Sequence, residues 1–174
     1  LRKAQERLKK LHERKLVKRC RFSPLEPYCY YIGSKPGNLE HTLALNWVYI
    51  WFIKGLKSWE QIHCFNTEVV YGELRCDAFV AIKNKVTGKI KLCFVELDRA
   101  TNPFDKVPKY NHFYQTDGYR KCWWYDVADR FPVVLIVTTT HKRAANIQKR
   151  IDAENINGLE FKTVLLDDIK EELQ

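Results

Sequence analysis

The chain has 174 residues, 45% of them hydrophobic, and carries a formal net charge of +9 at pH 7. This length suits one domain, or one domain with a small appendage, and it allows a sizeable core without disulfide staples. The longest apolar stretch, residues 43–53, is too short to cross a bilayer, so we expect a cytoplasmic protein with no membrane partner. The six cysteines stand singly without a Cys-x-x-Cys pair, which argues against structural zinc and indicates reduced, buried thiols.

Positive charge is concentrated at the start of the chain. Residues 1–22 hold ten Lys or Arg and two acids, a net +8 of the total +9. A cationic end on a nearly neutral body points to a polyanionic partner. The alternative is a basic helix face that is merely solvated.

The first predicted elements are a basic helix over residues 1–14, a strand over 16–22, a proline-marked loop and a strand over 28–32. This order matches the C-terminal part of a winged helix, in which the helix enters a DNA groove and the strands form the wing. We therefore predict that residues 1–37 are the C-terminal part of a winged-helix unit that binds double-stranded DNA. Its candidate DNA-binding residues are Arg2, Lys3, Arg7, Lys10, Arg14, Lys18 and Arg19.

From residue 38 onward the predicted order is α-β-β-β-α-β-α-β. Asn38 can cap a helix that runs to residue 54 or 57. Strands are expected over residues 66–72, 75–82, 90–98, 131–138 and 160–166, with helices over 104–127, 141–154 and 167–173. This order predicts an α/β core over residues 38–174, in which helices flank a mixed sheet.

Three carboxylates fall at the ends of two predicted strands. Asp77 opens the 75–82 strand, whereas Glu96 and Asp98 end the 90–98 strand on one face. If the hairpin loop pairs these strands, the three acids converge, and their mutual repulsion requires a compensating cation. Mg²⁺ or Mn²⁺ held by Asp77, Glu96 and Asp98 would provide this compensation and suit phosphodiester hydrolysis. The alternative is a set of exposed acids paired with Arg75, Arg99 or Lys106.

At these residues the sequence resembles a known family. A strand Asp, a hairpin and a strand Glu between two helices are similar to the restriction-endonuclease-like superfamily. More narrowly, residues 39–46 (Leu-Glu-His-Thr-Leu-Ala-Leu-Asn), 75–78 (Arg-Cys-Asp-Ala) and 96–101 (Glu-Leu-Asp-Arg-Ala-Thr) resemble the replication-relaxation family of plasmids and other mobile elements. The resemblance covers about residues 1–115, and Glu-Leu-Asp-Arg is its most specific part. It implies a winged helix joined to a restriction-endonuclease-like core.

The resemblance also suggests further site residues and one departure. Nuclease superfamily members usually carry a lysine two residues after the strand Glu, where this chain has Asp98. Lys106 or Lys109 of the next helix could supply that lysine from another place. Glu40 matches the position of a further metal-binding acid in many superfamily members. A favourable acid at a helix N-terminus is the alternative reading of Glu40.

The leading functional hypothesis is a DNA-binding protein of a mobile element. Its core is a candidate metal-dependent endonuclease that acts in plasmid replication, relaxation or transfer. The alternative is a non-enzymatic accessory or regulatory protein whose nuclease-like core is degenerate, and a third reading is a transcriptional regulator. Besides DNA, the partners considered are a second copy of the chain and replication or transfer proteins.

Overall fold

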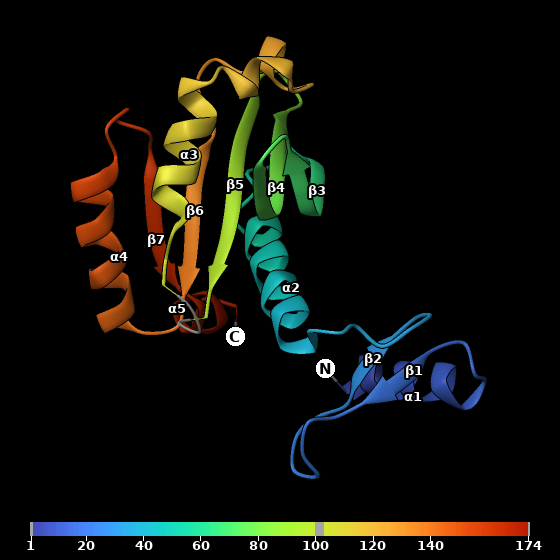
Figure 1. Ribbon diagram of the computed structural model, residues 1–174. Helices are drawn as coiled ribbons and strands as arrows, with labels where there is room; N and C mark the ends of the chain where they lie inside the picture. Colours follow the sequence, from blue (N-terminus) through green and yellow to red (C-terminus); the bar gives the residue numbers. More distant parts are fainter. Residues whose placement is uncertain (1, 100–102, 174) are drawn as a thin grey trace. The chain divides into compact units, whose positions relative to one another are not determined.

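The computed structural model describes residues 2–99 and 103–173. Ala100 and Thr101, the end of the 96–101 string, therefore lie outside the described residues. The chain divides into two compact units, one up to Thr42 and the other from Leu43 onward (Figure 1).

The first unit contains a helix and a small hairpin. α1 (Arg2–Glu13) buries none of its residues, and Lys15, in the left-handed region at φ 59°, lies in the turn after it. β1 (Lys18–Cys20) and β2 (Cys29–Tyr31) pair antiparallel, with Cys20 opposite Cys29. The predicted order of helix, strand and strand is confirmed, although both strands are shorter than predicted. Their assignment to a winged helix stays a prediction.

The second unit is built on a five-stranded mixed sheet. Its strands are β3 (Glu60–Tyr71), β4 (Leu74–Asn84), β5 (Ile90–Asp98), β6 (Val133–Thr138) and β7 (Phe161–Leu165), and they lie side by side in chain order. β3, β4 and β5 pair antiparallel, whereas β5, β6 and β7 run parallel because helices connect them. The predicted α/β class with a mixed sheet is confirmed.

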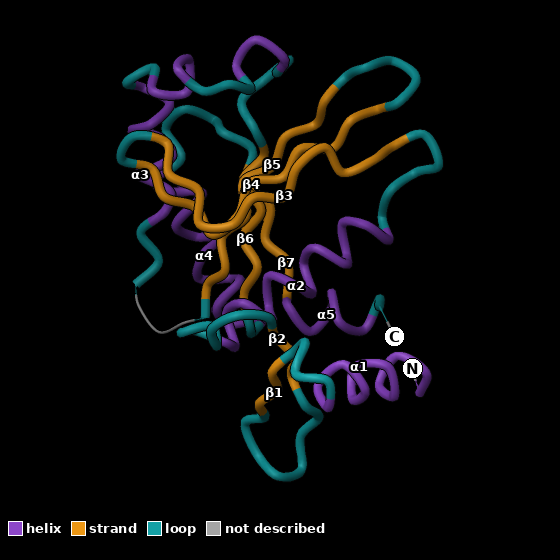
Figure 2. The backbone as a smooth tube through the Cα atoms, turned by 90° about the vertical axis from the view of Figure 1, so that its right-hand side faces the viewer, coloured by secondary structure: helices purple, strands orange, loops and turns teal. Residues whose placement is uncertain are grey.

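Helices cover both faces of this sheet (Figure 2). α3 (Lys106–Gln115) and α4 (His141–Glu154) pack on one face through residues such as Phe113 and Ile147. α2 (Leu39–Lys54) and α5 (Leu166–Glu171) pack on the other through residues such as Val48 and Ile169. Alternation along each strand supplies both faces, as a sheet between two helical layers requires.

Two predicted boundaries are wrong. The helix expected over residues 104–127 ends at Gln115, and two 3₁₀ turns follow at Gly118–Lys121 and Tyr125–Val127. The break is explained by Asp117 at φ 55° and by Gly118, where a Cβ would lie 2.8 Å from Phe113 Cδ2. β3 begins at Glu60, six residues before the predicted start, and its first residues pair with the end of β4.

The six cysteines are free thiols. Cys76 and Cys122 are buried, whereas the other four are half-buried, so the predicted burial holds for two of them.

Candidate functional site

Asp77 lies where the pairing of β4 with β5 ends. The register of the two strands runs from Lys83↔Ile90 to Ala78↔Val95. One residue further, Asp77 Oδ2 accepts a hydrogen bond of 2.7 Å from the backbone N–H of Leu97. The side chain thus takes the place that a backbone carbonyl of β4 would have in a continued ladder. This bond holds the Asp77 carboxylate beside the part of β5 that carries Glu96.

Glu96 is buried, with 1% of its surface exposed, and two side chains of α3 bind it. Tyr110 Oη donates a hydrogen bond of 2.8 Å to Oε1. Lys106 Nζ lies 2.7 Å from Oε2, and the contact is an ion pair rather than an aligned hydrogen bond. The same ammonium donates a hydrogen bond of 3.0 Å to the backbone carbonyl of Arg75. The carboxylate is therefore held at both oxygens.

Burial dominates the electrostatics of this carboxylate. The pKa of Glu96 is raised to about 7, because burial, with a smaller contribution from the negative charge of Asp77, outweighs the opposing effect of Lys106. Burial likewise raises the pKa of the Cys76 thiol to about 12, and the charge of Glu96 adds to that effect. Tyr110, with no exposed surface, has its pKa held well above 10 by burial and by Glu96, so it remains a hydrogen-bond donor.

Asp98 is on the same face as Glu96, as the alternation predicted, but it has other partners. Both of its oxygens accept hydrogen bonds of 2.7 Å from the Arg143 guanidinium of α4. Thr138 Oγ1, at the end of β6, donates a third bond of 3.0 Å. The fork-like contact with Asp98 raises the pKa of Arg143. Asp98 thus ties the end of β5 to the start of α4.

The two candidate lysines have different surroundings. Lys106 is 25% exposed and contacts Glu96, whereas Lys109 is 52% exposed and pairs with Asp105 at 2.5 Å. Of the two, Lys106 is the one that brings a positive charge to the buried carboxylate.

The residues present fit a divalent cation. Asp77 and Glu96 bring two carboxylates to neighbouring positions on β4 and β5, and carboxylate oxygens are ligands of divalent cations. Mg²⁺ is commonly bound through one or two carboxylates, with waters and substrate phosphates as its other ligands. Within residues 2–99 and 103–173 no group of three or more His, Cys, Asp or Glu side chains is arranged to hold a metal ion. A third protein ligand, from Asp98 or Glu40, stays a prediction.

Glu40 lies in the first turn of α2, where Asn38 Oδ1 caps the helix by accepting a 3.2 Å bond from the His41 N–H. The cap at Asn38 confirms the predicted helix start. An acid in this turn is favoured by the helix dipole.

The predicted DNA-binding residues are displayed on the first unit. Arg2, Lys3, Arg7, Lys10, Arg14 and Lys18 are exposed, whereas Arg19 is half-buried with its guanidinium 4.1 Å from the centre of the Tyr28 ring. Arg7, Lys10 and Arg14 share one face of the helix by their spacing. Their binding to DNA stays a prediction.

Sequence reasoning assigned no chemical role to Tyr110 and missed Arg143 altogether. Tyr110 follows Lys106 by four residues on α3, which places both side chains on one helix face. That spacing was a usable signal once Lys106 was considered. Arg143 comes from the first turn of the helix after β6, the parallel neighbour of β5, and only the strand order reveals that it meets Asp98.

Comparison with known proteins gives one match. A family model described as Replication-relaxation matches residues 32–128, which is more than half of the chain and includes Asp77, Glu96, Asp98 and Lys106. This match confirms the family resemblance that was predicted from residues 39–46, 75–78 and 96–101. It begins after β2, so the basic α1 and its hairpin lie outside the matched range. No curated protein and no solved structure matches the chain. In the described part of the chain, no helix is both long and apolar enough to span a membrane.

Proposed function

Since this chain belongs to the replication-relaxation family, we propose that it binds DNA and that its core hydrolyses phosphodiester bonds with Mg²⁺ or Mn²⁺. The family relationship by itself assigns a role in the replication or transfer of plasmids and other mobile elements. The nuclease activity and the mode of DNA binding are inferred from the residues.

One observation supports the nuclease proposal above all. A buried carboxylate, Glu96, lies next to a second strand-end carboxylate, Asp77, and has the Lys106 ammonium 2.7 Å away. Burial desolvates Glu96 and, together with the negative charge of Asp77, raises its pKa to about 7. A carboxylate whose pKa is strongly perturbed by desolvation and by a charged neighbour is a candidate functional group. Such an arrangement suits cation-assisted chemistry on a phosphate.

Each residue has a definite task in this proposal. Asp77 and Glu96 would hold the cation, which when bound polarises the phosphodiester and supplies hydroxide for in-line attack. Tyr110 fixes the orientation of Glu96 through its 2.8 Å hydrogen bond, so that Oε2 faces Lys106. Lys106 occupies the role of the lysine absent at Asp98, and its ammonium would bind and orient water or a phosphate oxygen. Arg143 and Asp98 hold β5 against α4.

DNA binding is assigned to the first unit. α1 carries an exposed stripe of cations and buries none of its residues, so these side chains are available to phosphates. Because the cations of α1 and the carboxylates belong to different units of the chain, we expect that binding and cleavage can be lost independently.

The deciding experiment compares cleavage of supercoiled, linear and single-stranded DNA by the wild type, Asp77→Asn and Glu96→Gln. We expect cleavage by the wild type only with Mg²⁺ or Mn²⁺, and none by either variant, because an amide does not supply the charge that holds the cation. Glu73→Gln is a matched control, since Glu73 lies in the turn between β3 and β4 and its side chain is 91% exposed.

A second candidate function is a non-enzymatic DNA-binding accessory protein. The residue at position 98 favours this function. The nuclease superfamily that the core resembles usually has a lysine there, whereas this chain has Asp98, whose two oxygens accept hydrogen bonds from Arg143. Wild-type protein that binds DNA but cuts none of the three substrates with either metal would establish this second function.

A further inference from the structure

A cavity of about 640 Å³ lies in the second unit, mainly on the sheet face that carries α2 and α5. Its apolar wall includes Phe52 of α2, Ile82 of β4, Cys93 of β5 and Leu135 of β6. Glu96 and its partners face α3 on the opposite side of the sheet. The cavity is therefore separate from the proposed nuclease site, and its volume falls within the range of small-molecule sites, about 300–1,000 Å³.

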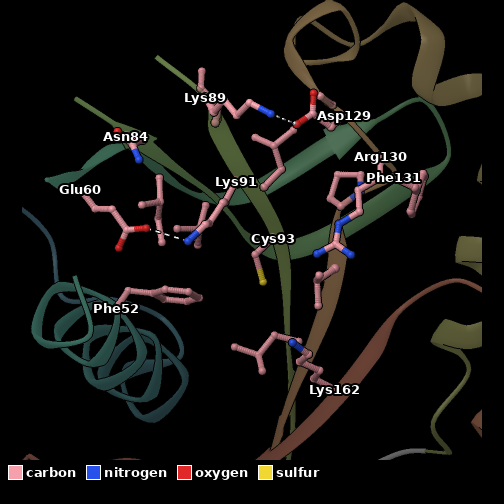
Figure 3. A pocket seen from close by; sticks show the side chains of 18 of the residues that line it. Phe52, Glu60, Asn84, Lys89, Lys91, Cys93, Asp129, Arg130, Phe131 and Lys162 are labelled. Atoms are coloured by element: carbon pink, nitrogen blue, oxygen red, sulfur yellow. Dashed lines mark hydrogen bonds and ion pairs between the residues drawn. The ribbon is translucent and has the colours of Figure 1, made fainter. Parts of the chain in front are cut away.

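The two ends of the cavity differ in chemistry. Figure 3 shows Asn84 on one side, Arg130 and Lys162 on the opposite side, and Cys93 between them. Asn84 begins the β4–β5 turn, where its Oδ1 accepts 2.9 Å hydrogen bonds from the N–H groups of Val86 and Thr87. These two bonds fix the plane of the amide and occupy its oxygen, so its NH₂ group is the part that can donate to a base edge.

The opposite end carries the cations Arg130 and Lys162, and the acid beside them in the cavity wall, Asp129, is paired with Lys89 at 3.5 Å. Arg130 Nη1 lies 3.0 Å from Glu160 Oε2, and Lys162 Nζ lies 3.0 Å from Oε1 of the same carboxylate. Two cations thus share one negative charge. A ligand anion placed between them would complete the neutralisation, and an Arg with a Lys is a common pair for phosphate.

The middle of the cavity suits a flat apolar body. The Phe52 ring extends toward Cys93 (Figure 3). Ile82 and Leu135 also line the cavity from the sheet. The fixed amide matches the edge of a base, the aromatic wall matches its ring, and the cationic end matches the phosphate of a nucleotide. We propose that this cavity binds a nucleoside monophosphate unit, either as a free nucleotide or as the phosphorylated end of a DNA strand.

Isothermal titration calorimetry of the full chain tests the proposal with deoxyadenosine monophosphate, deoxyadenosine and inorganic phosphate. We expect saturable binding of the nucleotide and at least about tenfold weaker binding of either fragment, because each fragment meets only part of the cavity. Arg130→Ala and Lys162→Ala should each weaken nucleotide binding about tenfold, the effect of losing one charged hydrogen bond. Arg120→Ala is the matched control: Arg120 is an exposed arginine paired with Asp117 and is not among the residues that line the cavity.

A second titration uses a short single-stranded DNA with or without a 5′-phosphate. Tighter binding of the phosphorylated strand than of the mononucleotide identifies a strand end as the ligand, and the reverse identifies a free nucleotide. Asp77→Asn should bind the nucleotide as the wild type does, so failure of the nuclease proposal leaves this result unaffected. The proposal is overturned if the nucleotide does not saturate the protein in the millimolar range. Equal affinity for deoxyadenosine and its phosphate, or equal losses in Arg130→Ala and Arg120→Ala, would also overturn it.

Discussion

Lys106 and Lys109 differ by less than one helical turn in α3, yet their environments separate their roles. Lys106 lies against Glu96 and the carbonyl of Arg75, whereas Lys109 extends to exposed Asp105. We expect Lys106→Ala to lower the rate of metal-dependent cleavage by about 10²-fold, as loss of one charge-stabilising donor commonly does. Lys109→Ala should leave the rate within about twofold of the wild type, because the pair it breaks is exposed. Single-turnover cleavage assays of both variants decide between the two lysines, and equal rates would contradict a role for Lys106.

Glu96 should make the stability of the protein depend on pH. Its pKa in the folded chain is about 7, above the ordinary value of about 4.5, because burial disfavours the charged form. Between these two values the folded state binds more protons than the unfolded state, so the free energy of unfolding falls as pH rises from about 4.5 to 7. The loss is on the order of 3 kcal/mol, at about 1.4 kcal/mol per pKa unit.

Denaturant unfolding between pH 4 and 8, in the presence of a chelator, measures this effect. The difference in unfolding free energy between the wild type and Glu96→Gln should decrease across that interval. Tyr110→Phe removes a hydrogen bond to the charged form, so it should move the midpoint of the pH effect upward. If the difference in unfolding free energy between the wild type and Glu96→Gln does not change with pH, the Glu96 carboxyl has an ordinary pKa.

At the scale of elements, α1 is an exposed cationic helix whose side chains contribute little to a core. Replacing Arg7, Lys10 and Arg14 with Ala should weaken DNA binding and reduce its salt slope by about one per lost phosphate contact. Fluorescence anisotropy with duplex DNA at several salt concentrations measures the slope. Three exposed lysines of the second unit, Lys85, Lys121 and Lys149, give a control with the same loss of charge. If the salt slope of DNA binding falls in the control variant instead, the DNA site lies on the second unit.

The site forms where the regular pairing of β4 with β5 stops. Beyond Ala78↔Val95 the carboxylate of Asp77, rather than a backbone carbonyl, takes the N–H of Leu97. α3 then brings Lys106 and Tyr110 over the same strand end, and α4 brings Arg143 to Asp98. A strand pair and one helix therefore place Asp77, Lys106 and Tyr110 at Glu96, and a second helix supplies the partner of Asp98.

For the molecule as a whole, metal binding at the core should appear as added stability. A cation at 100 times its dissociation constant stabilises a protein by about 2.7 kcal/mol. For a chain of this size that corresponds to an increase of roughly 5–10 °C in Tm. Thermal unfolding with and without Mg²⁺ should show this increase in the wild type and not in Asp77→Asn. Because the variant keeps α1 intact, its DNA affinity measured in a chelator should equal that of the wild type. An increase that persists in Asp77→Asn would place the cation elsewhere.

The sequence by itself determined the order of the elements and identified acids that lie at the candidate site. The alternation of side chains along a strand placed Glu96 and Asp98 on one face. The motifs at residues 75–78 and 96–101, which resemble the family, identified Asp77 and Glu96 as candidate site residues. These features are local, because strand periodicity and short motifs depend on neighbours along the chain.

Tertiary structure decided the partners of each acid. Lys106 rather than Lys109 meets Glu96, and Arg143 meets Asp98, because the parallel pairing of β5 with β6 brings the start of α4 next to the end of β5. Such contacts join residues up to 45 positions apart. Neither periodicity nor charge along the chain carries that information, since it arises only when strand order and helix packing are set.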